Sequence, residues 1–280
     1  MTGFLRKIGL ALLLLNLAAG PAAALDRGLA EAQAAFDSGA FARAAVLARK
    51  LHTGEGYALA SRAEMVRGEF GAVENGARLA RFKAALDDGR RAVARDPDRP
   101  EAHLAVAVAL GLIARGEGGI MAHFKGYGTE AREHIDEALA LNRANHWAHA
   151  ALGGWHLEIV YAGGALGSAV YEASAEAGIA AYEHALALDP DNMSIQYQYA
   201  FQLVGLGGAD NRARGGDLLE TIAARKPHTA LDRLLQGSAS ELKSALDRGD
   251  DAAAARIVSV RLGRSVAGSA DPRPPATRTR

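Results

Sequence analysis

Three histidines in one short stretch are the residues of this chain best suited to chemistry. His146, His149 and His156 are followed closely by Glu158, and His103 repeats the position of His149 one unit earlier. Imidazole nitrogens and carboxylate oxygens are ligands for Zn²⁺ and similar divalent ions. The stretch nevertheless lacks the His-x3-His pair that places two ligands on one helix face. A periplasmic metal- or small-ligand-binding site at these histidines is therefore kept as an alternative, and packing in the core or between units is the preferred interpretation.

Other catalytic arrangements find no support in the sequence. The glycine-rich segments lack the Lys-Ser/Thr ending of a P-loop, and no serine stands in a Gly-x-Ser-x-Gly motif. The carboxylate pairs Asp87-Asp88 and Asp250-Asp251 fall on expected polar faces or helix starts, which indicates solvation and capping. The absence of cysteine excludes disulfides, thiolate metal sites and cysteine nucleophiles. We expect a protein that is not an enzyme and that needs no cofactor.

A repeated phrase defines the elements that must position these residues. The sequence ALALN at 138–142 returns as ALALD at 185–189, and a weaker copy ends at Asp96. The step is 46 residues from Asp96 to Asn142 and 47 from Asn142 to Asp189. Self-similarity at a fixed period indicates stacked helical units. Abundant alanine and scarce proline favour helices, which we expect over 26–38, 41–52, 55–69, 75–95, 100–114, 129–141, 145–161, 172–188, 193–206, 212–225, 228–247 and 250–262.

The small residues of these units resemble those of the tetratricopeptide repeat. In that repeat, small residues mark where the two helices of a unit cross, and proline starts the next unit. The matching first-helix positions are Ala107, Gly153 and Ala200, and a weaker fourth copy reads Gly215, Leu219 and Pro227. The matching second-helix positions are Ala85, Ala92, Ala131, Ala138, Gly178 and Ala185, beside which Ile135 and Tyr182 should fill the space. The resemblance implies an all-α, TPR-like right-handed superhelix of antiparallel helix pairs.

Two units carry insertions of about a dozen residues between their helices, at 115–128 and 161–171. The stretch 152–160, the glycine-rich insertion after it and the ALALDP ending are also similar to the regulator-of-microtubule-dynamics branch of these proteins, over about 140–205. That resemblance implies the shape of a helical-repeat adaptor. It does not imply a role with tubulin, because we expect this chain to be exported.

The two ends of the chain are expected to lie outside the repeat domain. A basic start at Arg6 and Lys7, an apolar run and the small residues of 21–24 are typical of a signal peptide over 1–24, although a retained anchor stays open. The domain is then 25–264, followed by a polar, proline-containing tail over 265–280 that we expect to be disordered. The zero formal charge and the lack of a basic stripe argue against nucleic acid. The mature protein is predicted to be periplasmic, with no membrane span.

Binding is the function that the repeat favours. In the resembled architecture the first helices line a concave groove, which would suit an extended or helical protein segment. The expected groove residues are Glu101, Leu104, Val108, Trp147, Ala150, Leu157, Ser194, Tyr197 and Phe201. We therefore predict an adaptor or assembly factor that captures a protein or peptide partner, a capture that Trp147→Ala or Tyr197→Glu should weaken. A subunit that associates with copies of itself remains a third hypothesis.

Overall fold

The computed structural model describes residues 21–71 and 74–262. Within them lie α1 Pro21–Asp37, α2 Phe41–Arg49, α3 Gly54–Val66, the π-helical turn η1 Arg67–Gly71, α4 Asn75–Arg95, α5 Pro100–Glu117, α6 Gly119–Phe124, α7 Tyr127–Leu141, α8 His146–Tyr171, α9 Ala175–Leu188, α10 Met193–Leu206, α11 Ala209–Ala224, α12 Ala230–Asp247 and α13 Asp251–Arg261. No strand occurs among these residues, which confirms the all-α class. No helix in this part of the chain is both long and apolar enough to cross a membrane.

The predicted ends fall largely outside this part of the chain. Of the expected signal peptide, only residues 21–24 are described, and they form the first turn of α1. The expected tail over 265–280 lies wholly outside the described residues.

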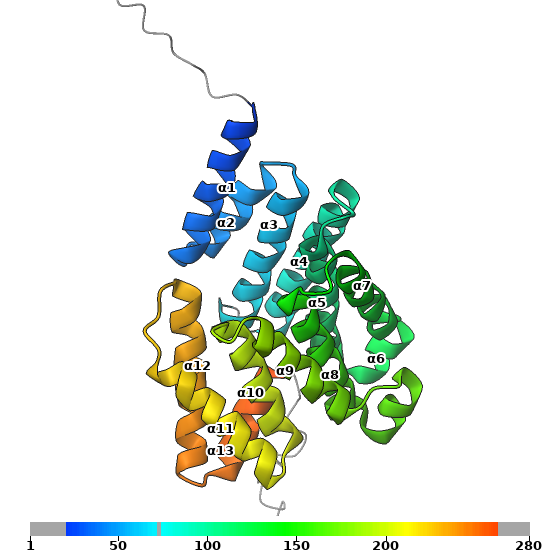
Figure 1. Ribbon diagram of the computed structural model, residues 1–280, viewed down its shortest axis with the longest axis vertical. Coiled ribbons are helices and arrows are strands. Elements are labelled where there is room, and N and C mark those ends of the chain that lie inside the picture. Colours follow the sequence, from blue (N-terminus) through cyan, green and yellow to red (C-terminus); the bar gives the residue numbers. More distant parts are fainter. Residues whose placement is uncertain (1–20, 72–73, 263–280) are drawn as a thin grey trace, which may run out of the picture.

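The helices pack in successive pairs along the chain (Figure 1). The pairs are α1–α2, α3–α4, α5–α7, α8–α9, α10–α11 and α12–α13. The first helices of four consecutive units, α3, α5, α8 and α10, also contact one another in order. These four helices therefore form a continuous layer, which we call the inner layer.

Helix starts follow the period of the sequence. Thr53, Asn145 and Asn192 cap α3, α8 and α10, and each side-chain oxygen accepts a hydrogen bond from the backbone N–H three residues later. Asn145 and Asn192 are 47 residues apart, and Thr53 precedes Asn145 by two steps of 46. Such a cap satisfies one of the unpaired N–H groups at a helix start, which stabilises it by about 1 kcal/mol. The period thus fixes where each inner helix begins.

The small residues lie where the helices cross, as the repeat predicts. A Cβ on Gly153 would stand 2.6 Å from Tyr182 Cδ2, and one on Gly178 would stand 2.5 Å from Leu157 Cδ2. Both distances are too short for real carbon contacts, so the α8–α9 crossing requires glycine at both positions. Tyr182 and Ile135 are fully buried beside their crossings, which confirms the expected filling of that space.

Both insertions are helical and contact each other. The first contains α6, which the sequence did not predict, and the second continues α8 past a break at Gly164, where φ is 54°. The Trp155 indole N–H donates to the Gly128 carbonyl at 2.8 Å, and Tyr171 Oη lies 2.8 Å from His123 Nδ1. Tyr127 and Tyr171 pack against the core around Trp155, so these rings fill the space between the insertions and the repeat.

The first and last helices share one hydrophobic core. Buried side chains of α1, α2 and α3, including Phe36 and Val66, form a single cluster with Tyr197 and Phe201 of α10 and with the apolar faces of α11, α12 and α13. Figure 1 shows α12 next to the α1–α2 pair, and a Cβ on Gly39 in the turn of that pair would stand 2.9 Å from the Ala230 Cβ. The chain therefore closes on itself.

Two adjacent glycines of α11 provide a matched test of the crossing. A Cβ at Gly215 would stand 2.8 Å from Val204 Cγ2, whereas one at Gly216 would meet nothing within 4 Å. Gly216→Ala should raise the free energy of unfolding by about 1 kcal/mol through helix propensity. The unfolding free energy of Gly215→Ala should be about 1–3 kcal/mol lower than that of Gly216→Ala, because the added methyl group overpacks the crossing with α10. Urea denaturation measures both, and equal stabilities would contradict the crossing geometry.

Candidate functional site

The inner layer carries most of the residues that the sequence assigned to partner binding, but it leaves few of them accessible. Glu101, Val108 and Trp147 are exposed, and Ser194 is half-buried. The remaining five are buried: Leu104, Ala150, Leu157, Tyr197 and Phe201. The expectation of an apolar groove running over all nine positions is therefore wrong for the described structure.

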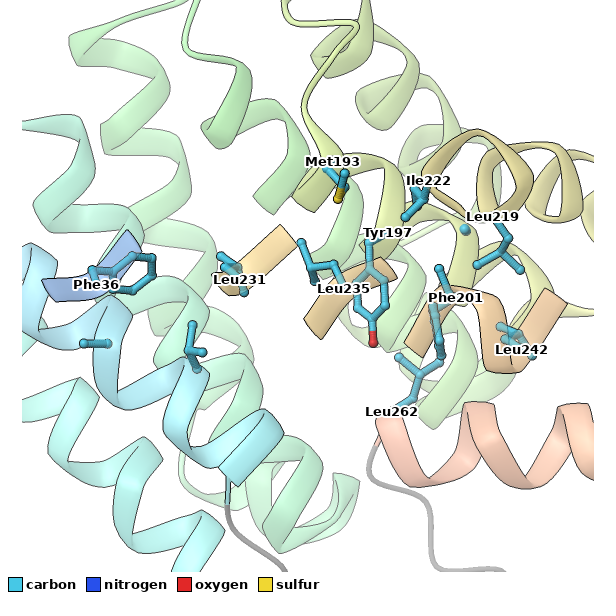
Figure 2. Close-up of a cluster of buried hydrophobic side chains, with 14 of the residues drawn as sticks. Phe36, Met193, Tyr197, Phe201, Leu219, Ile222, Leu231, Leu235, Leu242 and Leu262 are labelled. Atoms are coloured by element: carbon cyan, nitrogen blue, oxygen red, sulfur yellow. The ribbon is translucent and has the colours of Figure 1, made fainter. Parts of the chain in front are cut away.

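Tyr197 and Phe201 are buried because the C-terminal helices cover them. Their side chains are 2% and 1% exposed and lie in the core shared with α12 and α13. Figure 2 shows both rings pointing into this cluster, with Leu235 beside Tyr197 and Leu262 beside Phe201. The Tyr197 hydroxyl lies 3.0 Å from Ser238 Oγ of α12. The interior of the protein occupies this part of the expected groove.

The other three buried positions pack between neighbouring helices. Leu104 contacts a small cluster with Ala138 and Ala148, which joins α5 to α7 and α8. Ala150 and Leu157 belong to the core around Tyr182, which joins α8 to α9 and α10. Their burial stabilises contacts between units, so they offer no surface to a partner.

Three of the four accessible residues form a row at the start of the inner helices, and Val108 lies farther along α5. Glu101, Trp147 and Ser194 are separated by 46 and 47 residues, so they occupy the same position in successive units. Glu55 precedes Glu101 by another 46 residues and is also exposed on α3. We call the three residues of this row, together with Glu55, the first-turn row. Glu55 was missed by the sequence reasoning, although its spacing alone would have added it.

The three candidate metal-binding histidines do not converge. His149 Nε2 lies 2.9 Å from the Arg143 carbonyl oxygen, which can only accept, so this nitrogen carries a hydrogen that it donates. His156 Nδ1 accepts from the Ser174 N–H at 3.3 Å, and burial lowers the pKa of His156. His146 Nε2 lies 3.5 Å from Asp189 Oδ2. No group of three or more potential ligands that could hold a metal occurs within residues 21–71 and 74–262.

His103 and His149 instead follow the repeat. His103 Nε2 lies 2.7 Å from the Pro97 carbonyl oxygen, and His149 Nε2 lies 2.9 Å from that of Arg143, six residues earlier in each case. Gln196 repeats the contact one unit later by donating to the Pro190 carbonyl at 2.8 Å. Each side chain thus fixes the turn between two units, in keeping with the packing interpretation of these histidines.

A buried ionic network at the N-terminal units was not expected. Glu64 of α3 and Asp88 of α4 are each 2% exposed, and Arg49 of α2 bonds to both, at 2.9 Å and 2.6 Å. The hydrogen bond to Asp88 is the main reason why the pKa of Arg49 is raised. Asp88 is therefore no solvated carboxylate, whereas Asp250 caps α13 as expected by accepting from the Ala253 N–H at 2.9 Å. Because breaking such buried pairs is strongly destabilising, the network has a structural role.

A second polar chain crosses the inner layer from α5 to α10. Arg115 pairs with Glu158 of α8, and Gln202 donates to the same carboxylate at 2.9 Å. Burial disfavours the charged Arg115, but Glu158 and Glu69 more than offset it, and the pKa of Arg115 is raised. These residues hold neighbouring units together, and Gln202 is buried inside the fold.

The family model for regulator of microtubule dynamics protein 1-3 matches residues 30–246. The chain belongs to this family. The resemblance noted over 140–205 therefore extends over most of the repeat domain. No curated protein matches the chain.

Among solved structures, the family member described here is similar to a thermophilic TPR protein of Thermus thermophilus. The two share 18% sequence identity and superpose with a TM-score of 0.54, over 77% of this chain and 98% of that one. This similarity confirms the TPR-like helical-repeat fold. At this identity it carries no information on partners.

The buried Tyr197 provides a test of the closed core through pH. Burial raises the pKa of Tyr197 to about 12 from an ordinary 10.0. The contribution of the neutral Tyr197 ring to the unfolding free energy is therefore complete below pH 10 and is lost as the pH rises through 12. A difference of two pKa units between the folded and unfolded states corresponds to about 2.7 kcal/mol of unfolding free energy. Tyr197→Phe should lose less unfolding free energy than the wild type between pH 8 and pH 11.5, as measured by urea denaturation. An identical loss would contradict the burial.

The same position explains why Tyr197→Glu cannot report on partner binding. A carboxylate in place of a ring that is 2% exposed should lower the stability by several kcal/mol or unfold the chain. Weakened capture by that variant would therefore follow from the damaged core. Of the two substitutions suggested by the sequence, only Trp147→Ala changes an exposed side chain.

Proposed function

We propose that this protein is a non-catalytic scaffold that binds a protein partner on the accessible part of its inner layer. The observation that carries the proposal is the first-turn row together with Val108, where Trp147 is 36% exposed and Val108 is 40% exposed on adjacent inner helices. Aromatic side chains of this kind dominate binding energy at protein interfaces. A row with one residue in each unit suits a partner segment that runs across the units.

The state of the ionisable groups supports a role without catalysis. Glu64 and Asp88 are held by Arg49, and Glu158 is held by Arg115 and Gln202. Each of these carboxylates is thus already bonded to partners within the fold and holds neighbouring helices together. The TPR-like fold and the family membership support the same conclusion.

We further propose that the protein acts after export, as a periplasmic adaptor or assembly factor. The basic start, the apolar run and the small residues before Leu25 support this location. The family name refers to microtubule dynamics, which an exported chain would not meet. We therefore infer only the repeat scaffold from the family membership, and not a role in microtubule dynamics.

Partner capture tests the surface. Immobilised mature protein should enrich a specific partner from a periplasmic extract, quantified by mass spectrometry. The double variant Val108→Ser/Trp147→Ala should reduce that enrichment at least tenfold, because loss of a central aromatic contact costs about 2 kcal/mol or more. Circular dichroism should show unchanged helicity, since both side chains are exposed.

A matched control separates this surface from general loss of apolar area. Val46 of α2 and Leu188 of α9 are exposed to 50% and 40% on second helices. Val46→Ser/Leu188→Ala should capture as well as the wild type. Equal capture by both double variants would remove the inner layer as the binding surface, and self-association of the wild type in light scattering would favour a self-assembling subunit instead.

Export has its own test. Expression of the full chain in a Gram-negative host should release a mature form of 256 residues, which is 280 minus 24, beginning at Leu25. Of the described residues, cleavage there removes only the first turn of α1, so the core around Phe36 should remain intact. Intact-mass and N-terminal analysis of the periplasmic fraction decides the matter. A chain that keeps residues 1–24 in the membrane fraction would contradict cleavage.

A further inference from the structure

An open hollow of about 700 Å³ lies where the first part of the chain meets the last. One wall comes from η1 and α4, which contribute Glu69 and Arg78, and the other from α12 and α13. Its charged lining is completed by Glu241, Arg248, Arg256 and Arg261. We call this hollow the arginine cleft.

The arginine cleft has more positive charge than its own carboxylates neutralise. Arg78 lies 3.4 Å from Glu69, and Arg261 donates to the Glu69 backbone carbonyl at 3.0 Å. Arg248 donates to the Ser244 hydroxyl at 2.6 Å and forms no ion pair with a described residue. The Arg256 side chain makes no hydrogen bond or ion pair within the described part of the chain. Four arginines against two glutamates leave a formal excess of two positive charges.

The charges are distributed along the cleft rather than gathered at one point. Arg256 and Arg261 of α13 are five residues apart, a length of about 7.5 Å at 1.5 Å per residue, and Arg78 and Arg248 line the cleft from α4 and from the C-terminal end of α12. That length matches about two residues of an extended peptide at 3.3 Å each. A chain with several carboxylates fits this distribution better than one small anion.

An apolar strip runs beside the arginines. Val260 is 57% exposed, and Ile257 lies half-buried one turn earlier on the same face of α13. Aliphatic side chains beside guanidinium groups favour a ligand that has both apolar groups and carboxylates. A peptide meets this requirement, whereas inorganic phosphate does not.

We propose that the arginine cleft binds an acidic peptide segment of the partner. Carboxylates of the segment face Arg248 and Arg256, whose guanidinium groups have no competing carboxylate, and an apolar side chain of the segment lies on Val260. The inference rests on the proposed function in one respect, which is that the ligand of this scaffold is a protein. It adds the chemistry of the partner and a second contact surface away from Trp147.

A defined probe tests the cleft without knowledge of the partner. Fluorescence anisotropy at low salt would follow a labelled eight-residue peptide of alternating glutamate and leucine, with alternating lysine and leucine as its counterpart. The mature protein should bind the acidic peptide at micromolar concentration and the basic one at least tenfold more weakly. Added salt should weaken the binding, because charge contacts at an open surface are screened.

Charge-matched variants locate the binding. Arg248→Glu/Arg256→Glu should lower the affinity for the acidic peptide at least tenfold. The control variant Arg95→Glu/Arg233→Glu makes the same change in net charge at exposed arginines outside the cleft, and Arg95 lies at the end of a helix as Arg248 does. Its affinity for the acidic peptide should stay within twofold of the wild type. Unchanged thermal melting of both variants would show that they are folded.

Three results would overturn the proposal. The first is that the wild type does not bind the acidic peptide, and the second is that both double variants lose the same affinity for it. The third is that the wild type binds phosphatidylglycerol vesicles and the Arg248→Glu/Arg256→Glu variant does not, while neither of these two proteins binds the peptide. The last result would assign the cleft to a lipid surface. Because Trp147 and Val108 are unchanged in this assay, its failure leaves the capture experiment, and therefore the proposed function, intact.

Discussion

The packing of α12 and α13 onto α10 is the contact on which the rest of this structure depends. Without it, Tyr197 and Phe201 would face solvent at the end of the inner layer, and each such ring contributes about 1.5–3 kcal/mol when buried. The same contact brings α1, α2 and α3 into one core with the last four helices. Repeat units normally contact only their neighbours, so stability adds up along the chain. Here the ends also stabilise each other, and the number of units is fixed by closure.

Closure also determines which surfaces remain for binding. The inner layer keeps an accessible row at the starts of its helices, formed by Glu55, Glu101, Trp147 and the half-buried Ser194, but its C-terminal part is filled by the protein itself. Where the two ends of the chain meet, arginines of α4, of α13 and of the turn after α12 line an open cleft with too few carboxylates to neutralise them. A partner that is both apolar and acidic would match these two surfaces. The buried ionic network of Arg49, Glu64 and Asp88 joins α2, α3 and α4.

The sequence predicted most of the architecture because the repeat is encoded locally. The caps at Asn145 and Asn192 and the small residues at Gly153 and Gly178 act within one unit, so their spacing is sufficient to place the helices. The groove assignment was wrong for Tyr197 because periodicity shows that a helix face is apolar but not which distant helix covers it. The partner of Asp88 is likewise Arg49, 39 residues away, which no local pattern reveals. The short helix α6 was missed because the glycines at its start are typical of a turn.

Hydrogen exchange on a variant of the closing helices tests the central claim most directly. Leu235 of α12 is 3% exposed and belongs to the shared core, so Leu235→Ala should weaken closure by about 2–5 kcal/mol. We predict faster exchange not only in 230–261 but also in 193–204 of α10 and in 57–71 of α3 and η1, with the protection of α7 and α9 retained. Faster exchange confined to 230–261 would mean that the C-terminal pair is an appendage, and it would contradict a core held in common by both ends of the chain.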